Sequence, residues 1–199
     1  MSAIIAVVGS NFCTFASDSR LVQLDRSMNN IGVKSDRFLK IFRINHNLIY
    51  GASGTMEIND DLLAPFSGVV RKHLTMSQAK NLVVAHMVQN RDILPVRNVL
   101  LGGKNEMGKF IIYEIQIKTG MDNPTVTLKQ APDKNRFAVS YTIPNKCMLL
   151  YPILQDNRLS KTLPWGTHAA LVGHLEGLIK DLSEVDDSIG GDIIVESVM

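Results

Sequence analysis

The sequence predicts an α+β protein in which two antiparallel sheets stack on each other and helices cover their outer faces. Strand-like apolar runs come in pairs joined by short turns, which is typical of antiparallel hairpins. Along the chain the order is strands, two helices, strands, two helices and a final strand. This order does not fit the strict strand–helix alternation of a parallel sheet.

The first half of the chain predicts two hairpins. AIIAVV (3–8) and FCTFAS (12–17) flank a turn at Gly9–Asn11, and LKIFRI (39–44) and LIYGAS (48–53) flank the turn NHN. Between the hairpins, the polar stretch from Val22 to Asp36 predicts a long loop or an extended arm.

Helical patterns occur in two places. Apolar residues recur at helical spacing over 55–73, where Pro65 and Gly68 predict a break or kink, and over 75–92, with Thr75 or Ser77 as N-cap. A short helix is expected near 145–156 and a better one over 166–183. The remaining strands are expected at 96–103, 109–117, 125–130, 136–143 and 191–198.

Bulk composition fits one globular domain over residues 1–199. Hydrophobic residues make up 45% and charged residues 20% of the 199-residue chain, and the net charge is only +2. Scattered basic residues and this low charge give no reason to expect a nucleic-acid partner. Cys13 and Cys147 are expected to be buried free thiols, as in a reducing compartment. Because Gly9–Asn11 interrupts the apolar start, we expect neither a signal peptide nor a membrane span, and a cytoplasmic location.

Four positions could carry chemistry. Once Met1 is removed, Ser2 would carry both a hydroxyl and a free α-amine on the same residue. Such an amine has a pKa of ~7.7–8, which suits a general base. Asp18 should lie beside Ser2, because the second strand of the hairpin ends next to the start of the first. Lys40 shares an alternating strand face with Phe42 and Ile44 and therefore needs a partner such as Asp18. The backbone N–H groups of YGASGT (50–55) could bind an oxyanion.

Each of these residues also has a purely structural interpretation. Ser2 could be a small residue beside the initiator, Asp18 a turn cap, and Lys40 a strand-end lysine that reaches solvent. The five histidines lack metal-ligand spacing, so His168 and His174 are interpreted as surface or packing residues. AVVGSN lacks the G-x-G-x-x-G pattern of a dinucleotide loop.

Together these residues resemble the proteasome β-subunit and HslV family of N-terminal nucleophile hydrolases. The resemblance rests on SAIIAVVGSNFCTFASDSR, DRFLKIFRI, LIYGASGT, VLLGGKNEMGKFIIYEIQIKTG and DDSIGGDIIVESV, and it covers nearly the whole chain. It implies a four-layer αββα sandwich. It assigns the nucleophile to Ser2, the supporting carboxylate to Asp18, the lysine to Lys40 and the oxyanion N–H to Gly54.

Several positions depart from the family pattern. Serine replaces the usual threonine nucleophile, and either Ser140 or Thr142 could stand for the family's serine whose hydroxyl lies near the α-amine. In VDDSIGG, Asp186 or Asp187 could supply the later aspartate, and we place it at Asp187, with Ser188 nearby. Extra residues occur around QDNRLSKTLPWGTH, and Ala52 indicates a roomy specificity pocket.

The resemblance implies a peptidase that needs no metal or cofactor and self-assembles into a ring or stacked rings. Its substrates would be peptides or unfolded proteins, with an ATPase unfoldase as a possible partner. Two alternatives stay open: a weak or inactive ring scaffold, and an amidase or acylase of small amides. A Rossmann-type nucleotide binder would require a helix after Gly9.

Overall fold

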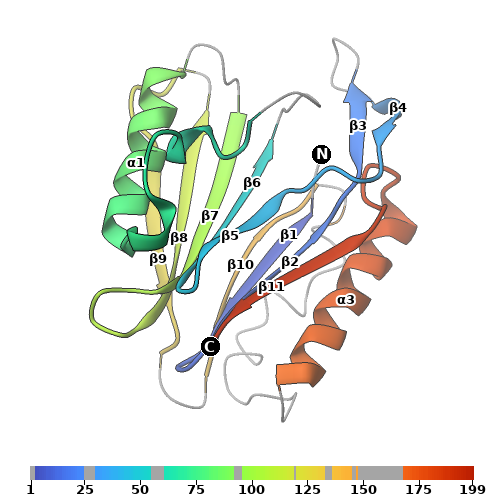
Figure 1. The fold of residues 1–199 in the computed structure, drawn as a ribbon. Coiled ribbons are helices and arrows are strands. Elements are labelled where there is room, and N and C mark those ends of the chain that lie inside the picture. Colours follow the sequence, from blue (N-terminus) through green and yellow to red (C-terminus); the bar gives the residue numbers. More distant parts are fainter. Residues whose placement is uncertain are drawn as a thin grey trace.

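The computed structural model describes residues 3–24, 30–54, 61–91, 96–118, 120–132, 136–144, 147 and 168–199. Within them the protein is α+β and mostly sheet, as predicted (Figure 1). The elements are β1 Ile4–Val8, β2 Cys13–Asp18, β3 Leu21–Leu24, β4 Asn30–Ser35, β5 Ile41–Asn45, β6 Leu48–Gly54, α1 Met76–Gln89, β7 Val96–Lys104, β8 Phe110–Lys118, β9 Thr125–Gln130, β10 Ala138–Thr142, α3 His168–Val185 and β11 Ile193–Val198.

A four-stranded antiparallel sheet contains both ends of the described chain. Its order is β10-β1-β2-β11, so the predicted β1–β2 hairpin forms the centre and the last strand pairs with β2. All five residues of β1 and all six of β2 are buried. Burial on both faces explains why β1 is continuously apolar rather than alternating.

A five-stranded antiparallel sheet, in the order β5-β6-β7-β8-β9, follows the chain from each strand to the next. The predicted strand pairs at 39–44 with 48–53 and at 96–103 with 109–117 are therefore confirmed. The β5–β6 and β7–β8 connections are short turns, which suits antiparallel neighbours, whereas α1 lies in the long connection between β6 and β7.

Three separate hydrophobic clusters hold the elements together. One lies between α1 and the five-stranded sheet, and another between α3 and the four-stranded sheet. A third joins the inner faces of the two sheets, with Ile4 and Phe15 from one and Leu100 and Ile112 from the other. The sheets approach so closely that a Cβ on Gly102 would lie 2.5 Å from the Phe15 ring. Figure 1 shows α1 and α3 on opposite sides of the pair of sheets.

The stretch expected to be a loop or arm from Val22 to Asp36 instead contains a two-stranded ribbon. β3 and β4 pair with each other, with irregular register at Leu21/Val22 and at Gln23/Leu24. The prediction missed the ribbon because β4 is exposed at five of its six positions and holds only two large apolar residues, Ile31 and Val33. In Figure 1 the ribbon stands at the upper right, beyond the four-stranded sheet.

The helix expected over 55–73 is wrong for residues 61–73, and residues 55–60 lie outside the described part. Two 3₁₀ turns stand there, Ala64–Phe66 and Arg71–His73. Pro65 lies in the first of them, and Gly68 follows with φ +75°, a conformation that ends helices. The next helix, α1, matches its prediction, and Thr75 is its N-cap. The short helix expected at 145–156 lies outside the described residues, apart from Cys147.

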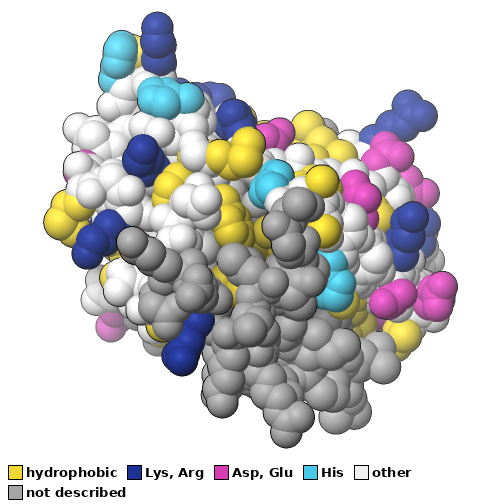
Figure 2. Space-filling view, turned by 90° about the horizontal axis from the view of Figure 1, so that it is seen from below, with side chains coloured by type: hydrophobic (Ala, Val, Ile, Leu, Met, Phe, Trp, Pro, Cys, Tyr) yellow, Lys and Arg dark blue, Asp and Glu magenta, His cyan; other side chains and the backbone are white. Residues whose placement is uncertain are grey.

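Surface features agree with the modest net charge. Figure 2 shows lysine and arginine side chains at separate points of the lower face rather than in one patch. None of the helices in the described ranges is both long enough and apolar enough to cross a membrane.

Candidate active site

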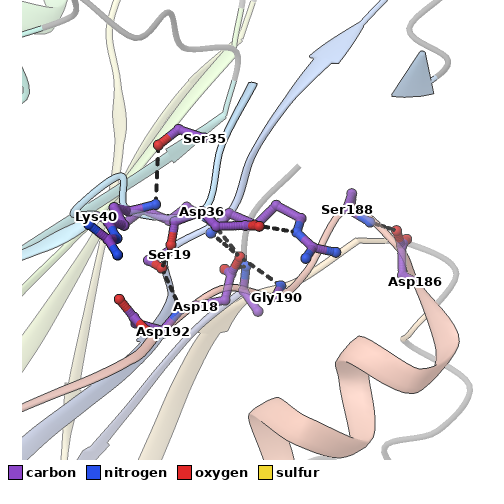
Figure 3. Close-up of polar contacts among 12 residues, drawn as sticks. Asp18, Ser19, Ser35, Asp36, Lys40, Asp186, Ser188, Gly190 and Asp192 are labelled. Atoms are coloured by element: carbon purple, nitrogen blue, oxygen red, sulfur yellow. Dashed lines mark hydrogen bonds and ion pairs between the residues drawn. The ribbon is translucent and has the colours of Figure 1, made fainter. Parts of the chain in front are cut away.

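Asp18 ends β2 and is completely buried. Its Oδ1 accepts a hydrogen bond from the Ala3 N–H at 2.9 Å, and its Oδ2 lies 2.7 Å from Lys40 Nζ. The main-chain N–H groups of Arg20 and Gly190 also donate to Oδ2, at 3.1 and 3.3 Å. Figure 3 shows the carboxylate between these segments. Four donors therefore compensate a charge that burial alone would make costly.

Lys40 is the cation of this pair, and its side chain is also 0% exposed. Burial lowers the pKa of its ammonium, while the charge of Asp18 and the hydrogen bond to it act in the opposite direction. The Lys40 carbonyl accepts a hydrogen bond from the Ala52 N–H at 2.9 Å, which fixes Lys40 beside β6. The prediction that Asp18 is the partner of Lys40 is thus confirmed.

Ser2 lies outside the described residues, so its position stays a prediction. Ala3, the next residue in the sequence, is fully buried and is tied to Asp18 twice. Its N–H donates to the carboxylate, and its carbonyl accepts from the Asp18 N–H at 3.3 Å. The chain position after Ser2 is therefore held directly against the Asp18–Lys40 pair.

A loop at the start of β11 closes the other side of Asp18. Arg20 Nε lies 2.7 Å from Asp36 Oδ1, and Arg20 Nη1 donates to the Asp187 carbonyl at 3.2 Å. A Cβ on Gly190 would lie 2.7 Å from the Arg20 guanidinium, so only glycine fits there without a shift. Neither Arg20 nor Gly190 was among the predicted site residues. Their only signals were their places in SDSR and IGGD, two segments that are far apart in the chain.

Asp187, the predicted later aspartate, is exposed, and its carbonyl contacts Arg20. Its neighbour Asp186 is the buried one: Asp186 Oδ1 accepts from the Ser188 N–H at 2.9 Å. Asp186 Oδ2 and the Ser188 hydroxyl are buried and have no hydrogen-bond partner in the described part of the chain. Of the two aspartates that the sequence left open, Asp186 faces the interior.

Gly54 ends β6 opposite Arg97. Its φ of +128° lies in a region that residues with a side chain rarely adopt, which explains glycine at this position. The residues that follow it, 55–60, lie outside the described part, so the expected helix N-terminus and oxyanion site there stay predictions.

The two candidate hydroxyls on β10 have different surroundings. The Ser140 hydroxyl donates a short hydrogen bond to the Glu114 carboxylate. The Thr142 hydroxyl is buried and has no partner among the described residues. Thr142 lies opposite Ile4 in the sheet, whereas Ser140 lies opposite Ala6, so Thr142 is nearer to the start of β1. Thr142 is therefore better placed than Ser140 to serve a site around residue 2.

His168 has a packing role, in line with the sequence interpretation. Its Nε2 lies 3.1 Å from Thr14 Oγ1 and 3.0 Å from Ser197 Oγ, and its ring meets Phe12 edge-on. These contacts attach the start of α3 to β2 and β11. No cluster of three histidine, cysteine or acidic side chains in the described ranges could hold a metal ion.

Comparison with protein-family models and with curated protein sequences gives no match to this chain. Chemically, the site offers a buried, hydrogen-bonded ammonium beside the first strand. Such a charge can lower the pKa of a neighbouring hydroxyl or amine without any metal.

Proposed function

We propose that the protein is an N-terminal-nucleophile hydrolase that cleaves peptide bonds with Ser2 after removal of Met1. The observation that carries this proposal is the buried Lys40–Asp18 pair, whose carboxylate also binds the N–H of Ala3. A buried ion pair contributes little to stability compared with a well-packed apolar pair, so its presence favours a functional role.

The chemistry would run in two steps. The Ser2 hydroxyl attacks the substrate carbonyl, and its proton passes to the Ser2 α-amine, which is the general base. Lys40 lowers the pKa of the hydroxyl, Asp18 orients Lys40, and the Gly54 N–H binds the tetrahedral oxyanion. The amine product leaves with the proton from the α-amine. Water then attacks the acyl-serine ester, releases the acid and restores Ser2.

The same proposal includes the four-layer αββα sandwich of the N-terminal nucleophile hydrolases. Support comes from the three hydrophobic clusters. They lie between α1 and the five-stranded sheet, between the two sheets, and between the four-stranded sheet and α3. Asp187 would have the role of the family's later aspartate, although Asp186 is the buried residue of the two.

The proposal also includes assembly into homo-oligomeric rings, unfolded-protein substrates, an ATPase unfoldase as partner and a cytoplasmic location. Cys13 and Cys147 are buried and form no disulfide, which suits a reducing compartment.

The alternative is a ring scaffold with weak or no activity, or an amidase of small amides. The Thr142 and Ser188 hydroxyls and Asp186 Oδ2, which have no hydrogen-bond partner among the described residues, favour the scaffold, because a fully equipped site would satisfy its buried polar groups.

Turnover of fluorogenic peptides and of small aryl amides tests the proposal. We expect Ser2→Ala to lower kcat by on the order of 10³-fold or more, because it removes the nucleophile, and Ser2→Thr to retain activity. Ser10→Ala, at an exposed position in the turn between β1 and β2, is the matched control and should match the wild type.

The substrates separate the alternatives. Cleavage of peptides favours the endopeptidase, whereas cleavage of small amides alone favours the amidase. Turnover that Ser2→Ala leaves intact would contradict the proposal, and a wild type that cleaves neither substrate would favour the scaffold.

A further inference from the structure

The inner face of the five-stranded sheet, which packs on the four-stranded sheet, ends in a row of polar side chains. Ser53 on β6, Asn98 on β7 and Gln116 on β8 lie directly opposite one another in register. Residues opposite each other in antiparallel strands point to the same face of a sheet, and side chains alternate between faces along a strand. Ile49 and Leu100, which share this face of β6 and β7, belong to the cluster between the sheets. Ser53, Asn98 and Gln116 therefore form a polar row on the inner face.

The polar row has hydrogen-bonding groups that the described part of the chain does not use. Ser53 is only 3% exposed, and its hydroxyl has no hydrogen-bond partner among the described residues. Gln116 Nε2 donates to Asn98 Oδ1, which leaves the Asn98 N–H groups and the Gln116 carbonyl oxygen for another group. Because a buried hydroxyl without a partner is unfavourable, a ligand that offers both a donor and an acceptor would stabilise the row.

Contacts between the two sheets show that the start of β1 points towards the polar row. A Cβ on Gly102 would lie 2.5 Å from the ring of Phe15, which pairs with the middle of β1. Closer to the row, a Cβ on Gly51 would lie 3.4 Å from Ile4, the first residue of β1. Residue 2 lies outside the described part of the chain, and by strand alternation it would share the face of Ile4 and lie nearer still to the row. This places the polar row beside the proposed nucleophile.

Exposure and charge around the row indicate which groups it can accept. Exposure increases from the buried Ser53 to the half-buried Asn98 and Gln116, so a side chain from solvent can reach the row. None of the three residues carries a charge. Glu114, two residues before Gln116 on the same face, accepts a hydrogen bond from the Ser140 hydroxyl, and its charge disfavours a second carboxylate nearby. A neutral group with one donor and one acceptor, such as a carboxamide, matches the row.

We propose that the polar row binds a carboxamide side chain, glutamine or asparagine, of the substrate beside the bond that is cleaved. The Asn98 N–H would donate to the carboxamide oxygen, the Gln116 carbonyl would accept from its N–H, and the Ser53 hydroxyl would donate to the same oxygen. The inference rests on the proposed hydrolase function, because it assigns the ligand to a substrate. Ala52 lies on the opposite face of β6, in the cluster beneath α1, so the row is separate from the pocket expected there.

Peptide binding to the full chain with Ser2→Ala tests the row in the absence of turnover. The probes are fluorescein-labelled alanine hexapeptides that carry glutamine, methionine or glutamate at one of the two central positions, and fluorescence anisotropy measures their affinity. We expect the glutamine peptide to bind on the order of tenfold or more tightly than the methionine peptide, because methionine has a similar shape but leaves the buried polar groups unpaired. The glutamate peptide should also bind more weakly than the glutamine peptide.

Substitutions in the row identify where the carboxamide binds. Asn98→Leu with Gln116→Met nearly keeps the size of both side chains and removes their amides, so it should abolish the preference for glutamine over methionine. Unchanged affinity for the methionine peptide would show that this double variant is folded. Ser53→Ala should weaken binding of the glutamine peptide alone. Gln89→Met, at the exposed end of α1, is the matched control and should keep the preference.

The outcomes separate this inference from the proposed function. Equal binding of the glutamine and methionine peptides, no binding of either, or a preference that the double variant keeps would overturn the carboxamide site. Wild-type cleavage of both peptides at equal rates would support the hydrolase and overturn the site. Selective binding to Ser2→Ala without cleavage by the wild type would support the site and contradict the hydrolase.

Discussion

Asp18 and Lys40 form a pair in which each residue depends on the other. Both side chains are fully buried and their charged atoms lie 2.7 Å apart. Loss of one partner leaves the other as an uncompensated buried charge, which costs far more than the pair contributes.

Substitution of Lys40 by methionine should therefore destabilise the protein strongly. We expect the free energy of unfolding in urea to fall by about 3–5 kcal/mol at neutral pH, because Asp18 keeps a buried charge without its cation. The double variant Asp18→Asn with Lys40→Met should recover part of that loss. Wild-type stability of Lys40→Met would show that the pair is not buried as described.

The sequence predicted this contact because both residues stand in short-range patterns. Asp18 follows a buried hairpin strand, and Lys40 shares an alternating face with apolar residues. Arg20 and Gly190 could not be predicted in the same way, since their contact joins segments 170 residues apart and depends on how β11 returns to β2. Which of Asp186 and Asp187 is buried likewise depends on the geometry of their loop, and two neighbouring aspartates in a sequence do not indicate it.

At the scale of elements, α1 is fastened to the turn between β7 and β8. Thr75 and Gln78 form a capping box at its start, and the Ser77 N–H donates to Glu106 Oε1 at 2.9 Å. That hydrogen bond, and next the one from the Thr75 side chain, lower the pKa of Glu106 from about 4.5 to about 2. The ionised carboxylate also lies at the positive end of the helix.

Glu106→Gln should reveal this cap as a pH-dependent loss of stability. Because the pKa is lower in the folded state, the contribution of Glu106 is complete above about pH 4.5 and disappears as the pH falls towards 2. We expect a loss of up to about 1 kcal/mol at pH 7, limited by the exposure of the side chain, and a smaller loss at pH 3. Urea unfolding at both values measures it, with Glu176→Gln as the exposed control. An equal loss at both values would contradict the assignment.

Elements with a buried face were predictable, and exposed ones were not. The hairpins and α1 have the apolar periodicity that burial imposes. The β4 strand is mostly exposed and has only two large apolar residues, Ile31 and Val33. Residues 61–73 have helical spacing that Pro65 and Gly68 interrupt. Apolar periodicity therefore predicted the elements that pack against other elements of the fold.

At the scale of the whole molecule, pairing between distant strands builds the site. β2 lies between β1 and β11, so the last strand of the chain reaches the end of the first hairpin. This pairing brings Gly190 to Asp18. The sequence predicted two stacked antiparallel sheets, but no local pattern specifies which strands lie next to each other in a sheet.

The role of Ser2 as the nucleophile is tested by the intact mass of the purified protein before and after reaction with a peptide vinyl sulfone. We expect a chain that lacks Met1 and gains one probe at Ser2, and no adduct at residue 2 in Ser2→Ala. An active protein that retains Met1, or a wild-type adduct that maps to another residue, would contradict the assignment of Ser2 as the nucleophile.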